Sequence, residues 1–203
     1  YKARETSIEK IPMVIARTGW SGELSYELYL QDRKLGNELF EIVYEAAKEF
    51  NGAVIAPNTI RTIEGGLLSY GSDFGREHSP YTIGLERLID LDQDIDFIGK
   101  EALKRINKAG LKEKLVGVEL EGEPILKVPE NFWPVLDGKD TKIGRLSRCF
   151  YSPRLEKNIG LAIVDRHDAN PGTEILVQAP FEKISSLVVD LPWFEAEKEV
   201  NLD

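Results

Sequence analysis

Cysteine, histidine and methionine are scarce in this chain of 203 residues. The sequence contains one cysteine, Cys149, two histidines and one methionine. A lone cysteine excludes a disulfide within the chain, and the absence of Cys and His pairs at ligand spacing gives no recognisable zinc site. We therefore expect no bound metal, and the single thiol does not favour a catalytic cysteine.

Long apolar runs and an excess of positive charge are also missing. No apolar run approaches the roughly 20 residues that span a bilayer, and no charged segment followed by an apolar one opens the chain. Acidic residues outnumber basic ones by 35 to 26, which disfavours a broad phosphate-binding surface. These absences predict a cytoplasmic protein with no membrane partner and no nucleic acid partner. The hydrophobic content of 42% is enough to form a core in one or two domains.

Residues 17–30 combine a turn that contains glycine with an alternating strand. The alternation places Glu27 and Tyr29 on one side of the strand, and Tyr26, Leu28 and Leu30 on the other. We expect the Tyr26 side to face the core. Burial of an unpaired charge is costly, so one interpretation gives Glu27 a binding partner. The alternative is an edge strand with Glu27 in water.

Periodicity and turn residues predict the other elements before Gly110. Apolar residues recur at helical spacing over residues 35–50, and Asn51 and Gly52 are typical of a helix end. Residue 58 or 59 can cap a second helix that continues to about Tyr70, unless the glycine pair at 65–66 ends it early. The remaining predictions are strands over residues 13–17 and 25–30 and a helix over residues 99–109.

After Gly110 the pattern changes to short runs rich in β-branched residues. Turn residues separate the runs, and Asp137-Gly138 is the strongest hairpin signal among them. Six short strands in this length suggest a small barrel or a sandwich. We place a domain boundary within residues 108–113 and expect residues 195–203 to form a solvated acidic tail. The six predicted strands are residues 115–120, 133–136, 143–150, 159–164, 174–178 and 184–189.

Two motifs carry a resemblance to a known family. The Arg-Thr-Gly-Trp-Ser-Gly-Glu run at 17–23, which continues to Tyr26-Glu27, is similar to the folate-binding signature of the glycine cleavage T protein (aminomethyltransferase) superfamily. Residues 57–74 resemble a helix of that family and the loop after it. The similarity is greater to the branch of tetrahydrofolate-dependent dimethylsulfoniopropionate demethylases, and it extends from about Ile11 to Phe194. That branch is resembled at Trp20, Tyr26-Glu27-x-Tyr29, Pro57-Asn58, Leu67-Leu68-Ser69-Tyr70-Gly71, Phe97-Ile98-Gly99-Lys100-Glu101, Cys149-x-Tyr151-Ser152-Pro153 and Asp190-Leu191-Pro192.

The resemblance implies an α+β fold and a folate-dependent activity. Residues 1–109 would form the C-terminal part of the T-protein-like folate-binding module, and residues 110–203 a small antiparallel β-barrel domain. Family members are longer, so the chain resembles their C-terminal half and would be inactive alone. Catalytic residues are expected in the missing N-terminal half of the same protein. The implied activity is methyl transfer from a small methyl-donor substrate to tetrahydrofolate.

Two alternatives to methyl transfer stay open. One is an aminomethyltransferase of the glycine cleavage system, which would work with a lipoyl carrier protein. In that family the aspartate used for carbon–nitrogen cleavage lies in the N-terminal half, and no residue here matches it. The other is a folate-binding iron–sulfur assembly factor without enzymatic activity. Such factors carry a cysteine in a Lys-Gly-Cys-Tyr-like signature, and Cys149 is not in that context.

The resemblance also proposes cofactor-binding residues. Glu27 matches the position that binds folate in the family, and a carboxylate can accept both the amide N–H and the amine of a pterin ring. Tyr29 shares its face and Trp20 opens the turn, so both could line the same cavity beside a cationic methyl donor; Trp20 could instead fill the core. Arg61 could meet folate's glutamyl carboxylate at a helix start, although the family's helix-start arginine aligns with Asn58.

Weaker candidates lie on the loop after the second helix and on the later strands. Solvated loop residues and exposed strand charges are the alternative explanation for all of them. The family shapes its central channel and its active-site entrance at the matching positions, which are Asp73, His78, Arg145, Arg148 and Tyr151.

Overall fold

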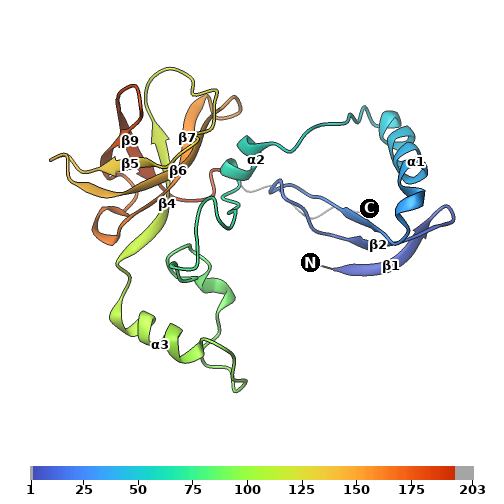
Figure 1. Ribbon diagram of the computed structural model, residues 1–203, viewed down its shortest axis with the longest axis horizontal. Helices are drawn as coiled ribbons and strands as arrows, with labels where there is room; N and C mark the ends of the chain where they lie inside the picture. The colour runs from blue at the N-terminus through green and yellow to red at the C-terminus, as the bar shows by residue number, and fades with distance from the viewer. Residues whose placement is uncertain (1, 195–203) are drawn as a thin grey trace, which may run out of the picture. The chain divides into compact units, whose positions relative to one another are not determined.

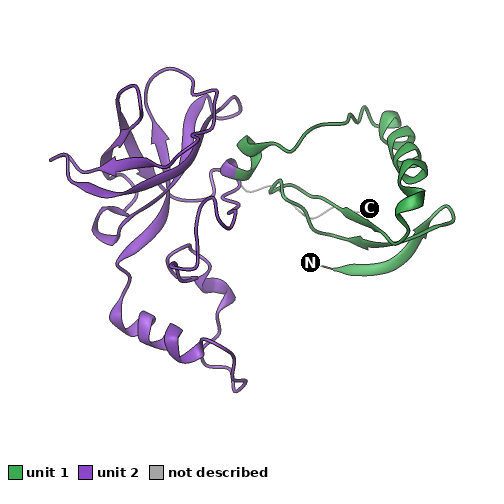
Figure 2. Ribbon diagram, in the orientation of Figure 1, with its two compact units in different colours: residues 1–62, 195–203 green, residues 63–194 purple. Residues whose placement is uncertain are grey.

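The computed structural model describes residues 2–194, so the predicted acidic tail at residues 195–203 lies outside the described residues. The chain divides into two compact units, drawn in green and purple in Figure 2. The first contains the described residues 2–62 and the second contains residues 63–194. Across residues 2–194, every helix is too short or too polar to cross a membrane.

The first unit is a three-stranded antiparallel sheet with one long helix (Figure 1). Strands β1 (Ala3–Ile8), β2 (Ile11–Ala16) and β3 (Glu27–Leu30) lie in the order β1-β2-β3. A short 3-10 helix, η1 (Arg33–Leu35), leads into α1 (Gly36–Glu49). The predicted helix at 35–50 and the two predicted strands are therefore confirmed, with ends shifted by one or two residues.

One face of this sheet and one side of α1 form the core of the first unit. Ile11, Met13 and Leu39 are buried together, and Leu28 and Leu30 of β3 pack against them. Burial of these side chains between a sheet face and a helix is the main stabilising contribution to such a small layer. Leu28 and Leu30 thus face the core as predicted.

Tyr26 is the exception on that side of the strand. It precedes β3 and is 59% exposed, so the prediction that it faces the core is wrong. The alternation begins only where β3 pairs with β2, at Glu27 opposite Ala16. A residue outside the ladder has no fixed pleat, and its side chain need not follow the alternation.

Helix α2 (Thr59–Glu64) is shorter than predicted. Its start is as expected, because the Asn58 side-chain oxygen accepts hydrogen bonds from the backbone N–H groups of Ile60 (2.9 Å) and Arg61 (3.4 Å). The continuation to Tyr70 is wrong, since the helix stops before the glycine pair. Gly66 has a φ of 62° and donates its N–H to the Ile63 carbonyl (2.9 Å), the usual way a glycine ends a helix.

The second unit is built around a closed six-stranded antiparallel barrel (Figure 1). All six strands predicted after Gly110 are present, and the choice between barrel and sandwich falls to the barrel. The strands close in the order β4-β7-β6-β5-β8-β9. Their bounds are β4 (Glu113–Leu120), β5 (Trp133–Leu136), β6 (Lys142–Ser152), β7 (Lys157–Asp165), β8 (Glu174–Gln178) and β9 (Lys183–Val189).

Strand β7 is buried on both faces. Ala162 and Val164 lie in the barrel interior, whereas Ile159 and Leu161 belong to a second cluster on the outside of the barrel. Ile63, buried in that outer cluster, follows directly after the first unit. The outer wall of the barrel is thus covered by chain from before the barrel, which explains the unbroken apolar run of β7.

This outer cluster also affects where the chain divides. Residues 63–109, which include the 3-10 helix η2 (Glu86–Leu88) and α3 (Lys100–Ala109), belong to the same compact unit as the barrel. The compact units therefore separate at residue 62, before the sequence-based boundary at 109/110. That boundary remains a prediction about domain organisation. Helix α3 itself confirms the helix predicted at 99–109.

Candidate functional site

Hydrogen bonds within residues 18–25 close the glycine-containing turn ahead of β3. The Ser21 and Ser25 hydroxyls are 3.0 Å apart, and the backbone N–H of Glu23 donates to the Ser21 hydroxyl (3.2 Å). Gly19 packs so closely on Ser25 that a side chain in its place would overlap the serine. The turn therefore requires glycine there, and it returns the chain so that Thr18 lies beside the start of β3.

Glu27 is held at this point by two hydroxyl groups. The Thr18 and Tyr29 hydroxyls both donate to one carboxylate oxygen, Oε2, and the Tyr29 bond measures 3.0 Å. The Thr18 bond, followed by the Tyr29 bond, lowers the pKa of Glu27 below its ordinary value. The same contact with Glu27 raises the pKa of Tyr29. At neutral pH the site therefore presents an ionised carboxylate beside a neutral phenol.

The orientation of the pair matches the sequence prediction. Glu27 pairs with Ala16 and Tyr29 pairs with Val14, so both side chains project from the face of the sheet opposite α1. Tyr29 is 53% exposed and Glu27 is also exposed. Glu27 is therefore neither buried nor in an ion pair within residues 2–194, and its partners there are the two hydroxyls.

Trp20 and Arg61 lie at two other points of the same turn region. Trp20 is 62% exposed, so the alternative in which it fills the core is wrong. Arg61, in α2, forms an ion pair with Glu23 of the turn (Nη1–Oε1 3.4 Å). The structure thus joins the turn to α2 through Arg61, and joins it to β3 through Thr18 and Glu27.

A second polar cluster is buried in the second unit. Asp73 has no exposed surface, and its carboxylate accepts two hydrogen bonds from the Arg148 guanidinium, at 2.8 Å from Nε and 2.6 Å from Nη2. It also accepts the Ser69 N–H (2.7 Å) and the Ser147 hydroxyl (2.8 Å). Arg148 reaches the Leu67 carbonyl as well (2.9 Å). The interpretation of Asp73 and Arg148 as solvated charges is therefore wrong: they tie the loop after α2 to the barrel.

A β-bulge makes this cluster possible. In a regular strand, neighbouring side chains point to opposite faces, so Ser147 and Arg148 could not both reach one carboxylate. Strand β6 pairs Leu146 with Ala162 and Arg148 with Leu161, which leaves Ser147 as an extra residue. Sequence reasoning had no signal for this bulge, and the ion pair joins residues far apart in the chain.

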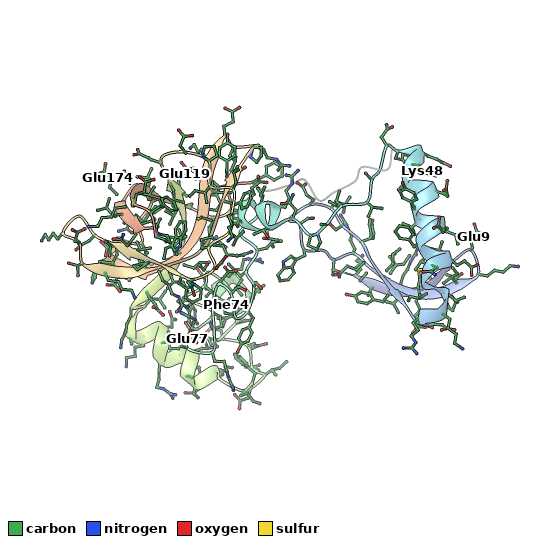
Figure 3. All side chains as sticks on the ribbon, turned by 45° about the horizontal axis from the view of Figure 1, so that its top comes forward. Glu9, Lys48, Phe74, Glu77, Glu119 and Glu174 are labelled. Carbon is green, nitrogen blue, oxygen red and sulfur yellow. The ribbon has the colours of Figure 1, made fainter. Side chains whose placement is uncertain are left out.

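The other weak candidates in the second unit make local contacts. The buried imidazole of His78 accepts the Gly75 N–H at Nδ1 (3.0 Å). Arg145 lies over the Phe132 ring at 4.4 Å and within 3.7 Å of Glu77, which Figure 3 labels on the loop between α2 and α3. Tyr151 is half-buried on β6. Among residues 2–194, His, Cys, Asp and Glu side chains form no group of three or more that could hold a metal ion.

Glu64 is a buried carboxylate that the sequence reasoning missed. The Ser152 hydroxyl donates to its Oε1 (2.6 Å), and Arg154 Nη1 lies 3.9 Å from its Oε2. The Glu64 carbonyl accepts the backbone N–H groups of Trp193 (3.0 Å) and Phe194 (3.2 Å). Its helical spacing from Ile60 could have indicated a buried side, whereas the partners on β6 could not have been found from spacing.

The fold class is that of a solved aminomethyltransferase. The structure is similar to the crystal structure of glycine cleavage system aminomethyltransferase T from Bartonella henselae, with a TM-score of 0.77. The similarity covers 90% of this chain and 50% of that one, at 20% sequence identity. At this identity the comparison shows the fold alone: an α+β module with a C-terminal barrel.

Sequence comparison then gives the family. Residues 1–93 match the GCVT N-terminal domain, and residues 113–195 match the glycine cleavage T-protein C-terminal barrel domain. Together these matches cover most of the chain, which belongs to the glycine cleavage T-protein family. The confirmed barrel coincides with the second match.

Curated relatives carry two different enzyme names. The chain is 32% identical to the dimethylsulfoniopropionate demethylase of Ruegeria pomeroyi over 181 residues, which is 89% of this chain and 48% of that protein. It is also 32% identical to the aminomethyltransferase of Caldanaerobacter subterraneus over 198 residues, 96% of this chain and 51% of that protein. The chain spans about half the length of the curated relatives it matches.

Proposed function

We propose that the protein transfers a methyl group to tetrahydrofolate, and that this chain supplies the part that holds the folate. The observation that carries the proposal is the Glu27 carboxylate: its pKa is lowered, it projects from the face of the sheet opposite α1, and Thr18 and Tyr29 fix one of its oxygens. It occupies the position where the family resemblance expects folate to bind.

The hydrogen-bonding capacity of Glu27 fits a pterin ring. A pterin offers an amide N–H beside an amine, and a carboxylate has about four acceptor positions over its two oxygens. Thr18 and Tyr29 occupy two positions on Oε2, while within residues 2–194 no hydrogen bond reaches Oε1. Oε1 can accept one pterin donor directly. Oε2 can accept the second once the exposed Tyr29 hydroxyl turns away.

Arg61 and Trp20 would complete the site. Arg61 is the cation of the turn region and could attract folate's glutamyl carboxylate, in exchange for part of its interaction with Glu23. Trp20 offers an exposed ring, which suits either a flat ligand or a cationic donor. Tetrahydrofolate, when bound, supplies the nitrogen that accepts the one-carbon unit.

A sulfonium donor asks little acid–base chemistry of this chain. Its sulfur leaves as a neutral thioether, so the leaving group needs no proton from a general acid. Fixed orientation of the two reactants and exclusion of water would then supply most of the rate. This requirement agrees with a chain whose candidate site holds a carboxylate engaged in binding.

An aminomethyltransferase reaction is the second candidate. Relatives with that name are about as similar to this chain as the demethylase is, which favours keeping it. It would add a lipoyl carrier protein as a partner. A non-enzymatic iron–sulfur assembly factor is disfavoured, because Cys149 is buried and burial raises the pKa of its thiol to about 12.

The folate product separates the two enzymatic candidates. Full-length protein, extended at the N-terminus to the length of its relatives, is incubated with tetrahydrofolate and either dimethylsulfoniopropionate or an aminomethyl-lipoyl carrier protein. We expect 5-methyltetrahydrofolate from the sulfonium, little methylene-tetrahydrofolate from the carrier, and no turnover by the 203-residue chain alone. Methylene-tetrahydrofolate as the sole product would transfer the proposal to the aminomethyltransferase. The cytoplasmic location remains a prediction.

A further inference from the structure

The second unit contains a cavity of about 800 Å³ beside the β8–β9 turn. One wall is the segment 121–134 between β4 and β5, and the other is the turn at 178–184. Its apolar lining includes Ile125, Trp133 and Phe181. The volume lies in the range of roughly 300–1,000 Å³ that is typical of small-molecule sites.

Hydrogen bonds to the barrel hold the wall formed by residues 121–134. The Asn158 side chain accepts the Ile125 N–H (2.8 Å) and donates to the Glu123 carbonyl (3.0 Å), and the Ile125 carbonyl accepts the Tyr151 N–H (2.8 Å). Asn158 is buried on β7. This wall of the cavity is therefore formed before any ligand binds.

An aromatic ring at the cavity is open to a ligand. Phe181 meets Trp133 edge-to-face, with ring centres 5.9 Å apart, yet Phe181 stays 67% exposed. On the same lining, Phe132 already carries the Arg145 guanidinium over its ring at 4.4 Å. Within residues 2–194 no cation covers Phe181. The chain thus shows one cation–aromatic contact here and leaves a second aromatic ring without one.

The charges that line the cavity are mostly negative. Lys127 is paired with Glu130 (2.5 Å), which neutralises both. Three other lining carboxylates, Glu121, Glu123 and Glu182, have no ion pair or side-chain hydrogen bond within residues 2–194. An anionic ligand would be repelled here, and a neutral one would gain nothing from the carboxylates.

We propose that this cavity binds a small organic cation with an apolar body, such as an ammonium group that carries an aromatic or alkyl substituent. The apolar body lies against Ile125 and Trp133, and the cationic head lies over Phe181 among the unpaired carboxylates. All the residues involved belong to the second unit, whereas Glu27 belongs to the first. The proposal therefore stands independently of folate binding.

Benzyltrimethylammonium is a suitable probe for the intact 203-residue chain. We expect binding with a dissociation constant of about 1 mM or below, measured by NMR titration at low salt, and a shift of the Trp133 indole N–H signal rather than those of Trp20 or Trp193. Phenylacetate, an anion with the same ring, should leave the Trp133 signal in place. A shift at Trp20 alone, or equal binding of phenylacetate, would overturn the proposal.

Three variants test the roles of the ring and the charges. Phe181→Ala should weaken binding roughly 3- to 30-fold, the range of a cation–aromatic contact. Glu182→Gln should weaken it about threefold at low salt, whereas Asp165→Asn, an exposed carboxylate outside the cavity lining, should leave it within a factor of two. All three replaced side chains are exposed, and two-dimensional NMR spectra check that each variant is folded. Unchanged binding by a folded Phe181→Ala variant would refute the site.

Discussion

Replacement of Arg148 by methionine tests how much the buried ion pair stabilises the second unit. The change keeps an apolar stem of similar length and removes the guanidinium. Asp73 would then retain only the Ser69 N–H and the Ser147 hydroxyl as donors, in a place without exposed surface. Three hydrogen bonds from Arg148, two to Asp73 and one to Leu67, would be lost together.

The expected loss of stability is large because the remaining charge stays buried. Removal of one partner from such a pair costs about 3–5 kcal/mol, most of it from the uncompensated carboxylate. With a urea dependence of about 2 kcal/mol per molar, the unfolding midpoint of the second unit should fall by about 1.5–2.5 M. Arg145→Met is the matched control on the same strand. Its partner Glu77 is exposed and 3.7 Å away, so we expect a loss of about 1 kcal/mol.

Urea unfolding followed by the fluorescence of Trp133 and Trp193 measures these differences, in a Trp20→Phe background that removes the signal of the first unit. The double variant Asp73→Asn with Arg148→Met should be more stable than Arg148→Met alone, since no buried charge is left unpaired. A loss below 1 kcal/mol for Arg148→Met, or no recovery in the double variant, would refute the reasoning.

Three further predictions concern single groups. Glu27→Gln in full-length protein should raise the tetrahydrofolate dissociation constant roughly 30-fold by calorimetry, because an amide presents an N–H to the pterin donors; the melting temperature without ligand should barely change. Thr18→Val removes the largest cause of the lowered Glu27 pKa, so a carboxyl ¹³C titration should move up towards 4.5. The lowered pKa means that this hydrogen bond stabilises the fold above the ordinary pKa and stops doing so as pH falls through the folded value; identical titrations would contradict this. Cys149 should react with a thiol reagent at pH 8 only after unfolding in urea, because burial raises its pKa to about 12; fast labelling of native protein would contradict it.

The elements were predictable where one physical rule dominates. Six strands followed from short β-branched runs between turn residues, and α1 and α3 followed from helical spacing. The end of α2 was not, because apolar spacing continues past Glu64 and only the backbone of Gly66 decides where the helix stops. Tyr26 failed for a related reason: alternation was extended one residue beyond the ladder that enforces it.

The candidate site was predictable only in part. Alternation alone puts Glu27 and Tyr29 on one face, and their hydrogen bond agrees with it. The hydroxyl of Thr18 could not be foreseen, since the turn that returns it to Glu27 depends on the contact between Gly19 and Ser25. Roles in folate binding for Glu27 and its neighbours stay predictions, because they rest on family resemblance.

The bulge at Ser147 makes the residue count of β6 as important as its chemistry. Leu146 and Cys149 both lie in the barrel interior although three positions separate them, which a regular strand would forbid. Deletion of one residue at 147 would restore even spacing and turn the following side chains inside out, with Cys149 outward and Phe150 into the packed core. Substitutions leave this count intact. The barrel is therefore expected to accept many single exchanges along β6 and to reject a loss or gain of one residue there, a difference that a deletion and substitution library sorted for folded protein would reveal.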